Sequence, residues 1–89
     1  MNAIITVVGN DRVGIIAAIC VKLAEYNANV LDLSQTSLHN TFTMIMAVDL
    51  SKANAPFAEI AEALRVLGEG MELSIHMHRE EIFDAMHTI

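Results

Sequence analysis

The chain has 89 residues and a formal net charge of −6, and its five lysines and arginines form no basic cluster. This charge balance argues against nucleic acid and anionic membrane surfaces as partners. The length allows one domain with a single core. Hydrophobic residues make up 54% of the chain and aromatic residues only 4%. We therefore expect an aliphatic, methionine-rich core, and so much apolar material in a small chain favours burial against a second copy.

The sequence also bears on location. Cys20 is the only cysteine, so no disulfide can form within the chain, as is usual in a reducing compartment. The N-terminus lacks the charged and apolar regions of a secretion signal, and no apolar run is long enough to span a bilayer. We expect a cytoplasmic protein.

The first stretch of interest joins a strand to a helix. Residues 3–8 are small or β-branched and apolar on both faces, which predicts a central strand. The sequence Gly9-Asn10-Asp11-Arg12-Val13-Gly14 follows, and its glycines and polar residues are typical of a tight turn into a helix. In such a turn the unpaired backbone N–H groups of the helix start can hold an anion.

A helix is predicted from about Val13 to Asn27. Its apolar stripe is formed by Ile16, Ile19, Cys20 and Leu23. The other faces carry Ile15, Ala18 and Val21, which is too apolar for a helix with one side in water. We expect part of this second face to contact a partner subunit.

Two strands are predicted next, Val30 to Leu38 and Thr41 to Leu50, with a turn near His39-Asn40 whose register the sequence leaves open. The core face of the second strand is expected to carry Phe42, Met44, Met46, Val48 and Leu50. Ile45 and Ala47 then lie on the opposite face of the sheet, together with either Ile4 and Val8 or Ile5 and Val7. An apolar open face again favours another subunit.

The C-terminal part predicts a helix, a strand and a tail. Pro56 suits the first turn of a helix, which Gly68 and Gly70 are expected to end. Its apolar stripe is formed by Phe57, Ile60, Leu64 and Leu67. Leu73, Ile75 and Met77 alternate with polar residues, as in a half-buried strand. The tail, residues 80–89, is expected to be helical, with Ile82, Phe83, Met86 and Ile89 on one side.

The predicted order is strand–helix–strand–strand–helix–strand followed by a short C-terminal helix. Right-handed crossovers place both helices on one face of a four-stranded antiparallel sheet, which is an α+β, ferredoxin-like βαββαβ fold. We expect residues 1–79 to form this domain and residues 80–89 to be a helical tail of the same domain.

This order, the loop Gly9–Gly14 and the sequence Val30-Leu31-Asp32-Leu33-Ser34-Gln35-Thr36 resemble the ACT-domain family over nearly the whole chain, and small stand-alone ACT proteins most closely. The resemblance implies a regulatory domain that binds an amino acid or similar small ligand where paired domains meet. The implied site is the first strand–helix loop and the helix start, completed by the second strand of a neighbour. Carried over by position, its residues are Asn10, Asp11, Val13, Gly14, Ile15, Gln35 and Thr36.

Amino-acid-regulated members often place a histidine at the start of this loop, an asparagine two residues on, and Pro-Gly at its end. Here these positions hold Gly9, Asp11 and Val13-Gly14, which argues against regulation by serine. Asp11 has two possible roles. It can cap the first helix, which stabilises a helix by roughly 1 kcal/mol, or it can pair with the ammonium group of a bound amino acid.

His76 and His78 are two residues apart on a strand, so both point to the same side. With His39, His87 or a symmetry-related pair they could bind a transition metal. The alternative is that they are polar residues on an open sheet face, and no metal or other cofactor is expected.

These observations favour a homo-oligomeric, dimeric or larger, regulatory domain that binds a small molecule, and an amino acid in particular, at the subunit interface. The first alternative is a protein-interaction module that regulates a metabolic enzyme without a ligand. The second is a metal sensor built on His76 and His78. We expect no enzyme activity and no catalytic residues, because no nucleophile–base pair is visible in the sequence.

Overall fold

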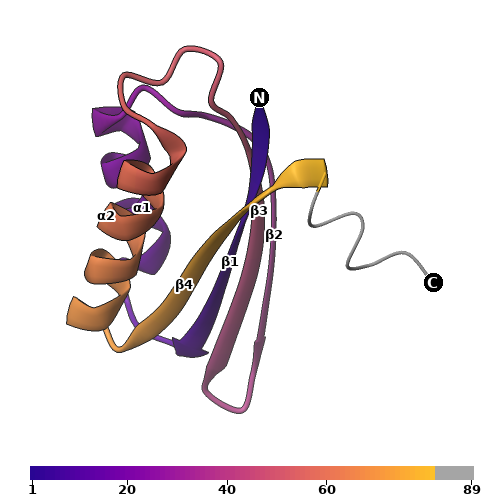
Figure 1. Ribbon diagram of the computed structural model, residues 1–89. Helices are drawn as coiled ribbons and strands as arrows, with labels where there is room; N and C mark the ends of the chain where they lie inside the picture. Colours follow the sequence, from indigo (N-terminus) through magenta and orange to yellow (C-terminus); the bar gives the residue numbers. More distant parts are fainter. Residues whose placement is uncertain (82–89) are drawn as a thin grey trace.

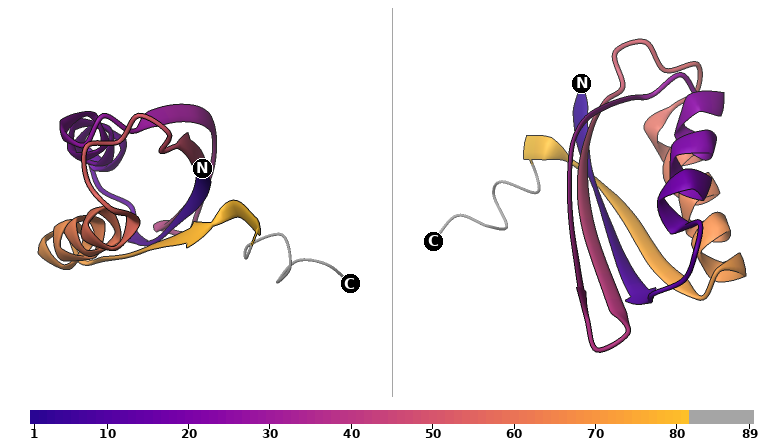
Figure 2. Two further views of the ribbon diagram at one scale, coloured as in Figure 1. Left: turned by 45° about the horizontal axis from the view of Figure 1, so that its top comes forward. Right: turned by 180° about the vertical axis from the view of Figure 1, so that it is seen from behind.

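The structure, a computed structural model, describes residues 1–81. Its elements are β1 (Asn2–Asn10), α1 (Ile15–Glu25), β2 (Asn29–Leu38), β3 (Thr41–Asp49), α2 (Phe57–Gly70) and β4 (Leu73–Arg79). The strands form one antiparallel sheet in the order β2-β3-β1-β4. Both helices cover the same face of this sheet (Figures 1 and 2). The predicted ferredoxin-like α+β fold is therefore confirmed. The predicted helical tail, residues 80–89, lies outside the described part except for its first two residues.

Strand β1 is central, as its apolar character on both faces predicts, because it pairs with β3 on one side and β4 on the other. It is longer than predicted, since every residue from Asn2 to Asn10 has a partner on β3. Ala3, Ile5 and Val7 are completely buried beneath the helices. Of the two sets left open by the sequence, Ile4 and Val8 therefore lie on the face that the helices leave uncovered.

The hairpin β2–β3 closes through a two-residue turn. His39 and Asn40 both have positive φ, 49° and 69°, as in a type I′ turn, and Leu38 pairs with Thr41. This turn sets the register of β3, whose predicted core residues are all buried: Phe42, Met44, Met46, Val48 and, just beyond the strand, Leu50. Near the other end of β2, a bulge at Leu31 brings Val30 opposite Val48.

The helices differ in detail from the prediction. In α1 the buried residues are Ile15, Ile19 and Leu23, whereas the sequence placed Ile15 outside the apolar stripe. Ile15 is the first residue of α1 and is 2% exposed, so the row spaced by four residues points at the sheet. After α1, Asn27 adopts a left-handed φ of 57°, the conformation that asparagine tolerates after a helix.

Helix α2 begins after Pro56, which is its N-cap, and ends at Gly70. Its buried residues are Ile60, Leu64 and Gly68. The prediction that Gly68 ends the helix is wrong, because Gly68 lies within α2 and packs closely against β4. A Cβ atom on Gly68 would lie only 2.7 Å from the carbonyl oxygen of Leu73. Neither helix, within residues 1–81, has the length and apolar character needed to cross a membrane.

Gly9 gives the first testable prediction, because β1 passes close to the start of β4 at this residue. A Cβ atom on Gly9 would lie 2.5 Å from Leu73 Cδ2 and 3.0 Å from the Glu72 carbonyl oxygen. Gly9→Ala should lower the free energy of unfolding by about 1–3 kcal/mol, the usual cost of overpacking. Gly70→Ala is the matched control, because nothing lies within 4 Å of its added Cβ. Urea denaturation measures both, and equal stability of the two variants would contradict the close approach.

Candidate functional site

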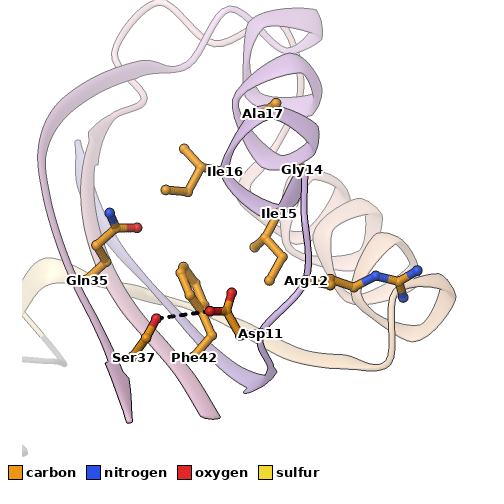
Figure 3. Close-up of a pocket in the computed structure, with 9 residues that line it drawn as sticks. All are labelled: Asp11, Arg12, Gly14, Ile15, Ile16, Ala17, Gln35, Ser37 and Phe42. Atoms are coloured by element: carbon orange, nitrogen blue, oxygen red, sulfur yellow. Dashed lines mark hydrogen bonds between the residues drawn. The ribbon is translucent and has the colours of Figure 1, made fainter. Parts of the chain in front are cut away.

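A pocket of about 560 Å³ opens where α1 begins, between the first turn of the helix and strand β2 (Figure 3). It is lined by the range Gly14–Ala17 together with Asp11, Arg12, Gln35, Ser37 and Phe42. The walls therefore come from the β1–α1 loop, the start of α1 and the two strands of the hairpin. This combination of elements places backbone donors, a carboxylate, an amide and a hydroxyl around one space.

The β1–α1 loop is held in place from two sides. On one side, the Asp11 N–H donates a hydrogen bond of 2.8 Å to the carbonyl oxygen of Asn40 in the β2–β3 turn, and the Ser37 hydroxyl donates one of 3.3 Å to Asp11 Oδ2 (Figure 3). On the other side, Arg12 Nη1 donates a hydrogen bond of 3.1 Å to the carbonyl oxygen of Met71, which precedes β4. The loop is thus bound both to the β2–β3 turn and to the segment between α2 and β4.

The start of α1 presents free backbone donors to the pocket. Gly14 is the N-cap, has a φ of 89°, and offers no side chain to cap the helix. The first helical hydrogen bond runs from the Ala18 N–H to the carbonyl oxygen of Gly14, at 2.9 Å. The N–H groups of Ile15, Ile16 and Ala17 precede this bond, as in any helix start, and these residues line the pocket. An anion is the ligand that such a group of donors favours.

Asp11 does not cap α1, so this reading of the sequence is wrong. The helix has no side-chain capping bond, and the Asp11 carboxylate instead accepts the hydrogen bond from Ser37 on β2. The carboxylate reaches across the mouth of the pocket toward the strand, as Figure 3 shows. Its pairing with an ammonium group stays a prediction.

The pocket brings together four of the residues that the sequence singled out: Asp11, Gly14, Ile15 and Gln35. Asn10, Val13 and Thr36 do not line it. Gln35 and Thr36 are neighbours on β2, so their side chains point to opposite faces of the sheet, with Gln35 on the helix side. Val13 points entirely into solvent and is 100% exposed.

Five residues of the pocket were not identified from the sequence: Arg12, Ile16, Ala17, Ser37 and Phe42. Two of them follow from the strand period. Ser37 is two residues beyond Gln35 and must share its face, and Phe42 is its direct partner on β3. The sequence that resembles the family stops at Thr36 and so leaves out Ser37. The alternation of side chains along β2 is the signal that indicates Ser37, and not Thr36, as the neighbour of Gln35 in the pocket.

His76 and His78 lie on the opposite face of the sheet, far from the pocket in the order of the strands. Their ring centroids are 6.4 Å apart and their planes differ by 24°. His76 Nε2 lies 3.2 Å from Ser74 Oγ. Within residues 1–81 of one chain, no group of three or more histidine, cysteine, aspartate or glutamate residues is arranged to hold a metal ion.

Gly14 gives a prediction that separates backbone strain from steric exclusion. An added Cβ would have nothing within 4 Å, but the φ of 89° is unfavourable for any residue with a side chain. Gly14→Ala should therefore lower the free energy of unfolding by about 1–2 kcal/mol. Gly14→Asn should cost less, because asparagine visits left-handed conformations more readily. Urea denaturation of both variants is the measurement, and an equal cost would contradict this explanation.

Comparison with known proteins identifies the family. A family model described as ACT domain matches residues 2–78. A UPF0237 protein of Listeria monocytogenes is 46% identical over 89 residues, which cover 100% of both chains. The solved structure of an ACT domain protein from Streptococcus pneumoniae has a TM-score of 0.81 and 37% identity over 93% of each chain. The regulatory subunit of aspartate kinase from Thermus thermophilus has a TM-score of 0.69 and 25% identity, over 89% of this chain and 51% of that chain. The chain belongs to the ACT-domain family.

Proposed function

We propose that the protein is a regulatory domain that binds an amino acid in the pocket at the start of α1 and acts as a homo-oligomer, with the ligand at a subunit interface. ACT domains are regulatory ligand-binding domains. The observation that carries the proposal is the position of the pocket, at the β1–α1 loop and the first turn of α1. The family resemblance implies a ligand at this same place.

The chemistry of the pocket suits both charged groups of a free amino acid. The ligand carboxylate would accept hydrogen bonds from the N–H groups in the first turn of α1. The ligand ammonium would pair with the Asp11 carboxylate, and such charge-assisted bonds are roughly twice as strong as neutral ones. Gln35 offers an amide to a polar ligand side chain, while Ile16 and Phe42 offer apolar surface.

Exposed apolar side chains on the β1–α1 loop, on α1 and on β2 support self-association. Val13 in the loop is 100% exposed, Val21 on α1 is 63% exposed, and Leu31 on β2 is 51% exposed. Strand β2 is also an edge of the sheet, so one side of its backbone has no strand partner among residues 1–81. A second copy that covers this region would bury the apolar side chains and meet Asn10 and Val13.

Regulation would then follow from linkage between ligand binding and assembly. A ligand that contacts two copies binds the assembled state better than the separate copies, and so favours assembly. The size of the effect is set by ligand concentration, about 2.7 kcal/mol at a hundred times the dissociation constant. No reaction needs to occur in the pocket for this output.

A thermal-shift screen with the twenty amino acids tests the ligand. We expect one or a few amino acids to raise the Tm of the wild type, and Gln35→Ala to reduce that rise. Thr36→Ala is the matched control, because Thr36 is adjacent to Gln35 but lies on the opposite face. Gly14→Leu should abolish the rise, since Gly14 lines the pocket and its φ of 89° is unfavourable for a residue with a side chain.

The same screen can reject the proposal. If no amino acid raises the Tm of the wild type, or if Gln35→Ala and Thr36→Ala reduce the rise equally, the pocket is not an amino-acid site. The exposed apolar side chains on the loop, α1 and β2 would then favour the protein-interaction module, which a pull-down of partner enzymes tests.

Sedimentation velocity tests the interface separately. Val13→Glu should weaken self-association without lowering the Tm of the separated chain, because Val13 contacts solvent alone in one copy. Val66→Glu, at an exposed valine on α2 outside the proposed interface, serves as the control for the same change from valine to glutamate. A wild type that stays monomeric at all concentrations, with and without ligand, would contradict a homo-oligomeric mechanism.

A further inference from the structure

The sheet face opposite the helices (Figure 2) is here named the open face, and it carries exposed apolar residues. Val8 on β1 is 47% exposed and Ile45 on β3 is 43% exposed. A hollow of about 200 Å³ lies beside Ile45, between Asp32 on β2 and Ile4 on β1. Exposed apolar surface of this kind marks an interaction site.

The registers of the three strand pairs align the open face in rows. Asp32 lies opposite Ala47, Ala47 lies opposite Ile4, and Ile4 lies opposite His78. The next row across the same strands is Ser34, Ile45, Thr6 and His76. Across these two rows, an acidic side chain therefore lies at the β2 edge, two imidazoles lie at the β4 edge, and the residues between them carry no charge.

This arrangement is complementary to itself. When two such faces stack about a two-fold axis parallel to the strands, the strand order is reversed but each row stays opposite the same row. Strand β4 of one copy then lies over β2 of the other, so the imidazoles face the Asp32 carboxylate twice, at two equivalent edges. A two-fold axis across the strands would instead place like groups together, His78 over His78 and Asp32 over Asp32. Charge complementarity selects the first arrangement, and stacked sheets lie about 10 Å apart, a gap that side chains from both faces fill.

The groups brought together have the chemistry of a metal site. His76 and His78 project from the same side of β4, with ring centroids 6.4 Å apart. Two imidazoles and one carboxylate form a ligand set that suits Zn²⁺ and related divalent ions. Residues 1–81 of one chain offer no group of three such ligands, and the stacked arrangement brings the Asp32 carboxylate of a second copy to this edge.

Hydrogen bonds within each chain also hold the Asp32 and His76 side chains in position, as is usual for metal ligands. Asp32 Oδ1 accepts a hydrogen bond of 2.8 Å from the Leu33 N–H, which leaves Oδ2 as a second acceptor atom. His76 Nε2 lies 3.2 Å from Ser74 Oγ, so Nδ1 is the ring nitrogen left for a metal. Metal ligands commonly have an outer hydrogen bond that fixes their direction.

We propose that two copies pack open face to open face, and that each of the two equivalent edges binds a divalent transition-metal ion between His76 and His78 of one copy and Asp32 of the other. The proposed site takes its carboxylate from a second copy, so metal binding and dimerisation are one event. It is also separate from the amino-acid pocket, which lies on the helix side of the sheet, and the failure of either proposal leaves the other intact.

Sedimentation velocity and isothermal titration of untagged protein with ZnCl₂ test this site. We expect Zn²⁺ to convert the chain to a dimer that holds one ion per chain. Asp32→Asn and His78→Ala should each weaken Zn²⁺ binding by at least about tenfold, the loss that removal of even an outer-sphere partner causes. Asp32 is exposed and His78 is half-buried, and the Tm of each variant without metal checks that it still folds.

Mixing of variants distinguishes a shared site from a site within one chain. Asp32→Asn keeps the histidines, while the double variant His76→Ala with His78→Ala keeps Asp32. Neither variant should dimerise with Zn²⁺ alone, but an equal mixture should form a dimer with one intact site, and hence half the wild-type metal content. A mixture that gains no Zn²⁺-dependent dimer would overturn the proposal.

Two control variants each remove a carboxylate or an imidazole that lies outside the proposed metal site. Asp49→Asn removes an open-face carboxylate on β3 that accepts a hydrogen bond from the Ser51 N–H. His39→Asn removes the histidine of the β2–β3 turn, where φ is positive and asparagine is tolerated. Both variants should keep the wild-type response to Zn²⁺.

The alternatives give distinct results, each of which overturns the proposal. A wild type that stays monomeric with Zn²⁺ would indicate that the chain's own C-terminal residues or nothing at all occupy the open face. Zn²⁺ binding that survives Asp32→Asn but is lost in His87→Ala would indicate a third ligand from the same chain. Dimerisation that needs no metal and survives all the histidine variants would leave an apolar contact without a metal site.

Discussion

The two-residue turn at His39 and Asn40 sets the register on which both sides of the sheet depend. The pairing of Leu38 with Thr41 continues without interruption to Asp32 and Ala47, so each side chain of β2 in this stretch has its face fixed by the turn. A turn longer by one residue would exchange the two faces, because side chains alternate along a strand. Gln35 would then leave the helix side. The same turn accepts the hydrogen bond from the Asp11 N–H, and so it also holds the β1–α1 loop.

The pocket combines a loop that hydrogen bonds hold in place with backbone N–H groups that no side chain caps. Hydrogen bonds from Asp11 and Arg12 fix the loop, whereas the start of α1 has a glycine N-cap and no side-chain cap. A serine or aspartate at the cap would stabilise a helix by about 1 kcal/mol, but it would also occupy the donors that face the pocket. The uncapped start is therefore consistent with donors kept for a ligand.

Much of the fold follows from the sequence, because periodicity reports burial directly. The residues of β3 alternate so regularly that Met44 and Met46 could be assigned to the core, and both are completely buried. The sequence does not predict the role of a residue whose partner lies in a distant part of the chain. Asp11 looks like a capping residue, but its partner Ser37 comes from a strand 26 positions further along the chain. Gly68 looks like a helix end, but the close approach of β4 explains it. Thr36 was included by resemblance, which follows position and takes no account of the face of the strand.

The hydrogen bond between Arg12 and Met71 requires a particular side chain at position 12 but not at position 71. The guanidinium belongs to a side chain, but its acceptor is a carbonyl oxygen of the main chain. Every amino acid supplies that oxygen, so the position before β4 can vary in evolution without loss of the bond. Changes at the arginine have no such freedom. The hydrogen bond between the β1–α1 loop and the segment before β4 thus depends on the identity of Arg12 and not on the identity of residue 71.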